Sequence, residues 1–406
     1  MTKETTGRVP LRFYWLIFLA AACLRVTLTS LGSFVEDISN DLSLSKAVAS
    51  LVVTIPTLCM GVCALLATPL SNRIGLERTI TLSIFTIAIA TFFRTHFSTV
   101  TLLILFSFVM GTGIAIVGPL ASGFVKRHFG TLSSRGMFLY SLGISVSGVL
   151  GTFGTSVLSG YFDLKWPVAL ELWALPIFLI ALFWALYYLR PSGNMANNRG
   201  QQEAKAPLPW GNKKAWLLVL CFGLQSGNFY TLVTWLIPYL EEQGVSALHS
   251  QILLNLFMLN GILGSFVFPF LLARFRKEVA IYVAAFMLIS SIMAILFFFE
   301  NRIILYSAIF VLGMTANAGM FVIVLTLPFH EVHSGNEIAS WTAMMSFGGY
   351  VISSMIPTLF GFIYDITNSY ANVMWGLLAS SILLLGCFLL FLYSKSEKPL
   401  QKIHQS

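Results

Sequence analysis

Apolar stretches long enough to cross a lipid bilayer recur along the whole chain. A hydrocarbon core is about 30 Å thick, and a helix rising 1.5 Å per residue needs roughly 20 residues to cross it. Of the 406 residues, 57% are hydrophobic and only 10% are charged, which leaves too little polar surface to cover a soluble core. We predict an all-α membrane protein with twelve spans, at about 13–35, 46–69, 78–97, 100–124, 136–160, 166–189, 214–240, 250–273, 279–299, 302–328, 338–362 and 369–393.

One long polar connection divides these spans into two sets. The segment 190–214, RPSGNMANNRGQQEAKAPLPWGNKK, has no apolar face and reads as a flexible surface linker. We therefore predict an N-terminal six-helix bundle at 1–189, a cytoplasmic linker at 190–213 and a C-terminal six-helix bundle at 214–406.

The charged residues of the connections predict the orientation. With the N-terminus inside, the inside segments carry most of the excess of Lys and Arg, whereas the outside segments hold acids such as Glu36 and Asp37 together with Arg94. Excess positive charge marks the cytoplasmic side. We expect a multi-pass protein of the inner (plasma) membrane with both termini cytoplasmic. The net charge of +8 then reflects topology and anionic lipid, with no support for nucleic-acid binding.

Arg25 stands near the middle of the first span, in FYWLIFLAAACLRVTLTSLGS. Inserting an arginine at that depth costs at least about 2.5 kcal/mol, so such a side chain normally faces a polar cavity or a partner. In the seventh span, Gln225, Asn228 and Phe229 are spaced i, i+3, i+4, which predicts one shared helix face at the same depth. A guanidinium opposite carboxamides suits a small planar anion or a polar heterocycle. The alternative is that the two amides hold helices together.

Two six-span bundles with both ends inside indicate the major facilitator arrangement, in which two bundles rock about a midplane site. The loop 69–78, PLSNRIGLER, resembles the G-x-x-x-D-R-x-G-R-R loop of that superfamily, and such a loop makes a tight turn at its glycine and holds the bundles together by charge contacts. Glycines at 143, 148, 151 and 154 in the fifth span predict close helix packing, with an antiporter signature as the alternative.

Several stretches resemble the cyanate permease and 2-nitroimidazole transporter family of the major facilitators. These are GLQSGNFYTLVTWLIPYLEEQG (223–244), LRVTLTSLG around Arg25, GTGIAIVGPLASGFVKRHF (111–129) and FGGYVISSMIPTLFGFIYDIT (347–367). By this resemblance Arg25 is an electrostatic anchor for the substrate. Gln225 and Asn228 would bond it, and Tyr230 and Trp235 would form aromatic walls or gates.

Alternatives remain for some of these positions. Trp235 stands near the outer end of its helix, so a place in the interfacial aromatic belt is equally consistent with the sequence. Tyr140 and Tyr350 are weaker candidates for the site. Thr315 and Asn317 either reach the cavity or bond a neighbouring helix.

The function that we expect is secondary active or facilitative transport of a small anionic or nitrogen-rich solute by alternating access. The alternative is a proton-coupled drug or xenobiotic efflux antiporter, for which Glu171, an acid within a span, is the candidate; coupling to a proton stays open. We expect no enzyme activity, catalytic residues, metal or cofactor, because the chain has no nucleophile elbow, phosphate loop or metal-ligand spacing. The five cysteines are expected to be packed free thiols, and the protein a monomer whose partners are its small-molecule substrate and the bilayer.

Overall fold

The computed structural model describes residues 9–96, 99–188, 207–332 and 334–394. Within these ranges, twelve helical segments are long and apolar enough to span a membrane, which confirms the predicted number of spans. A chain that crosses lipid as helices satisfies its backbone N–H and C=O groups internally, so helices account for nearly all of the described chain. The predicted segment 190–213 lies largely outside the described residues.

The first half of the chain, up to Tyr188, contains the elements α1 (Leu11–Gly32), α2 (Val35–Asp41), α3 (Lys46–Val62), η1 (Cys63–Leu66), α4 (Ala67–Ile74), α5 (Leu76–His96), α6 (Val100–Phe129), η2 (Gly130–Leu132), α7 (Ser133–Gly160), α8 (Trp166–Glu171) and α9 (Ala174–Tyr188). The second half contains α10 (Lys213–Glu242), α11 (Ala247–Arg274), α12 (Lys277–Phe297), α13 (Arg302–Leu312), the π-helical turn η3 (Gly313–Gly319), α14 (Met320–Glu331), α15 (Gly335–Thr367) and α16 (Tyr370–Tyr393).

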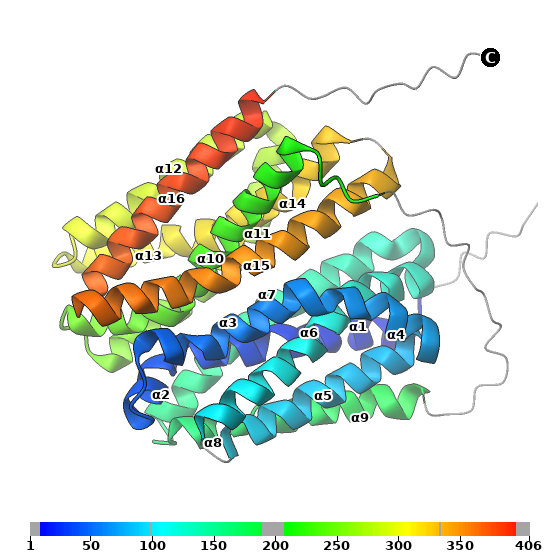
Figure 1. The fold of residues 1–406 in the computed structure, drawn as a ribbon, viewed down its shortest axis with the longest axis horizontal. Coiled ribbons are helices and arrows are strands. Elements are labelled where there is room, and N and C mark those ends of the chain that lie inside the picture. Colours follow the sequence, from blue (N-terminus) through cyan, green and yellow to red (C-terminus); the bar gives the residue numbers. More distant parts are fainter. Residues whose placement is uncertain (1–8, 97–98, 189–206, 333, 395–406) are drawn as a thin grey trace, which may run out of the picture.

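The two halves lie side by side, each packed mainly within itself (Figure 1). In the first half α1 packs on α7, and α5 packs on α6 and α9. In the second half α10 packs on α15 and α16, while α11 packs on η3. The α10 span is the most enclosed in the described chain, with 89% of its most apolar window buried, so it forms the centre of the second half.

The halves are joined mainly by α3 with α15, α7 with α11, and α1 with α10, and α10 also contacts α3. Glycines permit the closest approaches. A Cβ at Gly361 would lie 2.8 Å from the backbone of Lys46, and one at Gly61 would lie 2.8 Å from the carbonyl oxygen of Phe347. We call the end of the molecule that holds α2 and the α15–α16 turn the α2 end, and the opposite end, where residues 207–212 lie, the linker end; Figure 1 shows them at the left and right.

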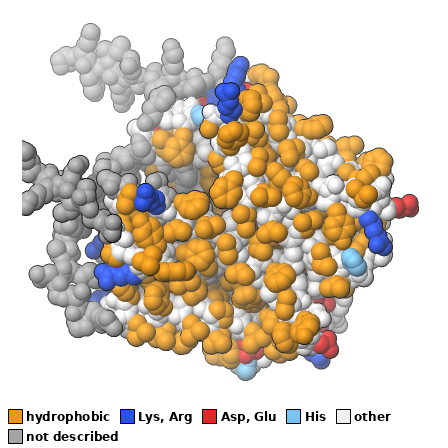
Figure 2. Space-filling model, turned by 180° about the vertical axis from the view of Figure 1, so that it is seen from behind, with side chains coloured by type: hydrophobic (Ala, Val, Ile, Leu, Met, Phe, Trp, Pro, Cys, Tyr) orange, Lys and Arg blue, Asp and Glu red, His pale blue; other side chains and the backbone are white. Residues whose placement is uncertain are grey.

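The outer surface suits a lipid environment. Figure 2 shows hydrophobic side chains covering most of one face, with Lys and Arg gathered mainly toward the linker end and acidic side chains toward the α2 end. All five cysteines are described, buried and unpaired, as the sequence predicted.

Helix irregularities are the main difference from the predicted spans. The second, sixth and tenth spans are each continuous in the prediction but are interrupted by η1, by Leu172–Trp173 and by η3, respectively. At the second of these breaks, Pro176 lies in the first turn of α9 and has no N–H to donate, which favours a helix boundary there. Apolar content alone does not report such local changes of hydrogen bonding.

The loop at 69–78 folds as predicted at its glycine but not in its contacts. Gly75 has a φ of +94°, a conformation that glycine adopts readily, and it joins α4 to α5. Glu77 is buried and pairs with Arg127 and His128 of α6, each at 3.1 Å. These charge contacts join helices of the first half, so the expectation that this loop's charges hold the two bundles together is not met by them.

The glycines of α7 provide close packing, as predicted. A Cβ at Gly143 would lie 2.5 Å from the carbonyl oxygen of Phe18, and one at Gly151 would lie 2.8 Å from that of Val26, so both glycines bring α1 against α7. Because the neighbouring atoms belong to the backbone, they cannot rotate away.

Replacing Gly143 by alanine should therefore destabilise the protein. An alanine in a helix interior is normally favoured over glycine by about 0.5–1 kcal/mol, but here overpacking should outweigh that gain, with a cost of about 1–3 kcal/mol. Gly386→Ala in α16 is the matched control, because no atom lies within 4 Å of a Cβ at that position. Thermal unfolding of the purified protein should give a lower Tm for Gly143→Ala and an unchanged or higher Tm for Gly386→Ala. Equal Tm values for the two variants would contradict the packing argument.

Candidate functional site

Arg25 extends from α1 toward the second half of the molecule. Its Cζ atom lies 4.2 Å from the centroid of the Phe229 ring and 5.8 Å from that of Tyr230, both on α10. The side chain is half-buried, and it forms no ion pair or hydrogen bond with any residue that the structure describes. A guanidinium over an aromatic face is held by the cation–π attraction, and its planar fork of N–H donors suits an anion with two acceptor atoms.

The space for Arg25 comes from a glycine on α7. A Cβ at Gly148 would lie 3.4 Å from Cγ of Arg25 and 3.1 Å from Cε of Met258 on α11. A larger residue at 148 would press on the arginine from one half and on the methionine from the other. The fifth-span glycines thus serve the candidate site as well as helix packing.

Tyrosines surround the Arg25–Phe229 pair. The Tyr230 hydroxyl lies 3.8 Å from Sδ of Met60 on α3, so α10 contacts the first half here as well. Tyr350 on α15 is half-buried, packs edge-on against Phe222 at 5.0 Å, and lies within electrostatic range of Arg25, Tyr230 and Tyr140. We call Arg25, Phe229, Tyr230 and Tyr350 the Arg25 cluster; of the two tyrosines that the sequence ranked as weaker candidates, Tyr350 belongs to it, and Tyr140 lies within electrostatic range of Tyr350.

The amides predicted to face Arg25 bind elsewhere in the structure. Gln225 is 2% exposed, donates from Nε2 to the carbonyl oxygen of Ala316 at 3.0 Å, and accepts from the Ser226 hydroxyl at 3.1 Å. Ala316 lies within the π-helical turn η3, so Gln225 joins α10 to the tenth span. This geometry favours the alternative in which Gln225 holds helices together.

Asn228 likewise binds within the second half. Its Nδ2 donates to Ser381 at 3.2 Å, its Oδ1 accepts from Ser380 at 2.6 Å, and the residue is 1% exposed. Both serines belong to α16. The three side chains that the spacing places on one face contact different partners: Gln225 the tenth span, Asn228 the twelfth span and Phe229 Arg25. Phe229 and Tyr230 are the residues of this stretch that the structure brings to Arg25.

Trp235 lies inside the second half and not at the lipid surface. It is 1% exposed, and its indole N–H donates to the carbonyl oxygen of Pro357 on α15 at 3.0 Å. Its ring lies 5.9 Å from that of Tyr370. This burial disfavours the belt alternative and places Trp235 toward the α2 end.

The polar residues of the tenth span form hydrogen bonds to helix backbone. Asn317 donates to the carbonyl oxygen of Met258 on α11 at 3.2 Å, and Thr315 donates to that of Val311 in its own span at 2.9 Å.

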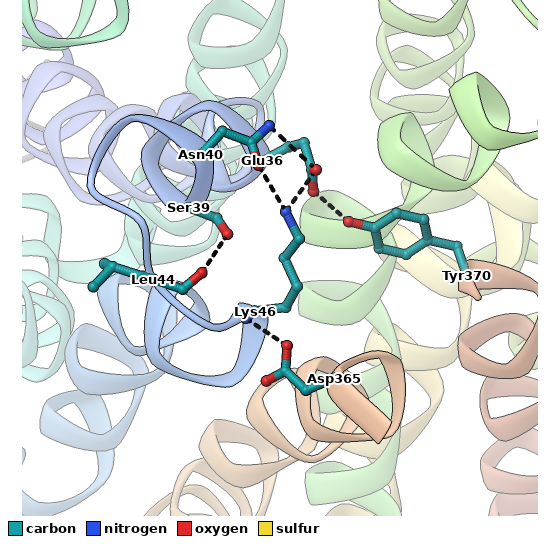
Figure 3. Close-up of polar contacts among 7 residues, drawn as sticks. All are labelled: Glu36, Ser39, Asn40, Leu44, Lys46, Asp365 and Tyr370. Atoms are coloured by element: carbon teal, nitrogen blue, oxygen red, sulfur yellow. Dashed lines mark hydrogen bonds and ion pairs between the residues drawn. The ribbon is translucent and has the colours of Figure 1, made fainter. Parts of the chain in front are cut away.

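A group of polar contacts between the halves closes the α2 end, and sequence reasoning did not find it. We call Glu36, Lys46, Asp365 and Tyr370 the latch (Figure 3). Nζ of Lys46 lies 2.6 Å from Glu36, and the same carboxylate accepts a hydrogen bond from the Tyr370 hydroxyl of the second half. Asp365 accepts from the backbone N–H groups of Lys46 at 2.8 Å and Ala47 at 3.0 Å, and thereby caps the N-terminus of α3 from the other half. The sequence feature that could have indicated the latch is the group of acidic residues after the first span, which includes Glu36.

Arg94, whose charge the sequence counted with the outside segments, is a second basic residue within a membrane-spanning helix. It lies in the last turn of α5 and is 0% exposed, with Nη1 donating to Sδ of Met110 at 3.0 Å. Met110 belongs to the neighbouring helix α6, and counting charges by segment does not report such burial.

Comparison with known proteins agrees with this architecture. The sequence matches the Major Facilitator Superfamily over residues 17–354. The chain belongs to that superfamily.

Two curated relatives come from Escherichia coli (strain K12). The cyanate transport protein CynX is 24% identical over 347 residues, covering 86% of this chain and 88% of the relative. The 2-nitroimidazole transporter is 25% identical over 373 residues, covering 91% and 92%. The expected resemblance is confirmed. Among solved structures, a bacterial homologue of the human lysosomal transporter Spinster, in an inward-facing and occupied conformation, superposes with a TM-score of 0.77 at 15% identity, covering 95% of this chain and 97% of that one.

The helix-bonding role of Asn228 can be measured directly. A double-mutant cycle of Asn228→Ala with Ser380→Ala should give a coupling energy of about 0.6 kcal/mol, and no more than about 1.7 kcal/mol, as found for hydrogen bonds between membrane helices. The stabilities should come from unfolding of the purified protein in mixed micelles. Asn228→Ala combined with Ser290→Ala of α12, whose hydroxyl bonds its own helix, should be additive. If the effects of Asn228→Ala and Ser380→Ala on stability are also additive, the hydrogen bond between these two residues does not contribute to stability.

Proposed function

We propose that this chain is a secondary transporter that moves a small anionic or nitrogen-rich solute across the inner membrane by alternating access. The observation that carries the proposal is the Arg25 guanidinium, which lies over the Phe229 ring and has no acidic partner in the part of the chain that the structure describes. A charge in a membrane-spanning helix is stabilised by water or a bound solute where no protein counter-charge faces it. Arg25 then anchors the solute and the aromatic rings of the cluster flank it.

The names of the relatives support this solute class. Cyanate is a small anion, and 2-nitroimidazole is a planar nitrogen heterocycle with acceptor oxygens. Both can accept hydrogen bonds from a guanidinium while a flat face packs on an aromatic ring. In this proposal Tyr230 contacts the solute, whereas Gln225 and Asn228 shape the site by fastening α10 to its neighbours, and Trp235 supports the closed α2 end.

Alternating access requires two bodies and a choice of sides. We assign the bodies to residues 1–189 and 214–406, with 190–213 as their connection, because helices within each range pack mainly on one another. We assign the linker end to the cytoplasm, since basic residues such as Arg73, Lys126 and Lys213 lie there. The latch then closes the outer side in the conformation described.

The efflux-antiporter alternative loses support from the position of Glu171. This residue ends α8, and its carboxylate lies 3.5 Å from Nδ1 of His96 at the end of α5, near the α2 end of the first half. Neither residue belongs to the Arg25 cluster. A coupling proton that binds there would act at a distance from the solute.

Removing the guanidinium should weaken recognition of the solute. Purified protein in proteoliposomes should be assayed for uptake of labelled cyanate, 2-nitroimidazole and a panel of small anions and nitrogen heterocycles. Arg25→Ala should lower the apparent affinity for the transported anion by about 10–100-fold, the value of one or two charge-assisted hydrogen bonds. Arg25→Lys should keep part of it, because lysine preserves the charge but not the fork.

Arg302→Ala is the matched control, since Arg302 is exposed at the start of α13. It should transport as the unmodified protein does. Uptake by Arg25→Ala that equals uptake by the unmodified protein would contradict the assignment of the site, and a panel with no transported member would contradict the solute class.

Weakening the latch should shift the protein toward opening at the α2 end. Asp365→Ala removes the acceptor for two N–H groups of α3, so the closed arrangement should lose about 1 kcal/mol or more. Spin labels at Lys165→Cys and Gln243→Cys, exposed positions of the two halves at this end, report the separation. Asp365→Ala should add a longer component to the distance distribution. Glu300→Ala, an exposed acid at the same end, should not, and identical distributions for both variants would exclude a latch function for Asp365.

A further inference from the structure

Glu171 and a groove beside it are not used by the proposed transport mechanism. The groove lies between α5 and the broken sixth span and has a volume of about 460 Å³. Its lining is apolar except for the Glu171 carboxylate, and includes Ala88, Phe92, Ala174 and Leu175.

The groove has a local cause in the sequence. The break between α8 and α9 at Leu172–Trp173 interrupts the helix that would otherwise cover α5. Ala88 and Ala174 face this interruption with single methyl groups, so the two helices leave a hollow. Large apolar side chains stand around it, and Leu175 is 61% exposed. Because both walls belong to membrane-spanning segments, this hollow opens toward lipid acyl chains.

The polar end of the groove carries a negative charge. The Glu171 carboxylate lies 3.5 Å from Nδ1 of His96, and the Phe92 ring, which lines the groove, stacks on the imidazole of His96 at 5.1 Å. Both residues lie at the α2 ends of their spans, the depth at which lipid headgroups begin. An apolar channel that leads to a carboxylate at the headgroup level matches a molecule with an alkyl chain and a cationic donor.

We propose that this groove is a binding site for a phospholipid with a primary ammonium headgroup. One acyl chain packs between Phe92 and Leu175, and the ammonium group donates a hydrogen bond to Glu171. An ammonium bearing N–H groups forms a charge-assisted hydrogen bond with a carboxylate, whereas a trimethylammonium group has no hydrogen to donate and an anionic headgroup is repelled. The inference needs only the membrane-spanning fold and is independent of which solute is transported.

Native mass spectrometry of the full-length protein, titrated with defined lipids, tests the site. The lipids are dioleoyl phosphatidylethanolamine, its N,N-dimethyl derivative, phosphatidylcholine and phosphatidylglycerol, all with the same acyl chains. The unmodified protein should bind the ethanolamine lipid about tenfold more tightly than the choline lipid, with the dimethyl lipid between them. Because the acyl chains of the lipids are identical, this order of affinities reports the contribution of the headgroup N–H donors.

Two variants separate the headgroup contact from the acyl contact. Glu171→Gln should remove the preference for the ethanolamine lipid, while Glu300→Gln, an exposed acid on the second half, should keep it. Leu175→Trp, which fills the groove, should weaken binding of the ethanolamine and choline lipids alike. Equal affinities of the unmodified protein for all four lipids, or an unchanged preference in Glu171→Gln, would overturn the proposal. So would undiminished lipid binding by Leu175→Trp.

Discussion

Arg25 lies within a membrane-spanning helix with no acidic partner among the described residues, and this constrains much of the structure. The contact of Arg25 with Phe229 crosses between the halves, and a cation over an aromatic face contributes about 0.5–2 kcal/mol depending on how dry the site is. That amount is smaller than the cost of moving an arginine into hydrocarbon, so the remaining stabilisation has to come from water or solute. Gly148 leaves room for the arginine, and the enclosure of α10 fixes the ring on which it rests.

The contacts between the halves differ in character along the molecule. Around Arg25 they are aromatic and sulfur contacts, which tolerate changes of angle. At the latch they are hydrogen bonds from backbone N–H groups to Asp365 and from the Tyr370 hydroxyl to Glu36, which are directional and are lost together when the halves part. The structure thus combines an adaptable centre with a rigid closure. A solute that gains contacts with both halves at the centre can offset the loss of the closure only through the difference between its affinities for the two conformations.

Apolar content predicted the twelve spans because each helix must cross the same thickness of lipid, whatever its neighbours are. It could not predict the breaks at Leu172–Trp173 and η3, which depend on which backbone groups find partners in adjacent helices. Arg25 was identified as a candidate site residue because the free-energy cost of placing an arginine within the membrane does not depend on which helices surround it. The partners of Asn228 on α16 could not be predicted, because helical spacing shows which residues share a face but not which neighbouring helix that face contacts. Asp365 and Glu36, distant in sequence, could be joined only by the packing of α3 on α15.

Asp365 accepts hydrogen bonds from the N-terminus of α3, a role that a residue just before a helix usually has for that helix. Ser45 caps only Val48, so the first two N–H groups of α3 depend on a side chain from the other half. When the halves separate, these groups must turn to water, and the first turn of α3 loses part of the order that holds it. The connection from α2 to α3 would then become more flexible as the outer entrance opens. Local fraying of a helix end and global rotation of the bundles would thus be a single event.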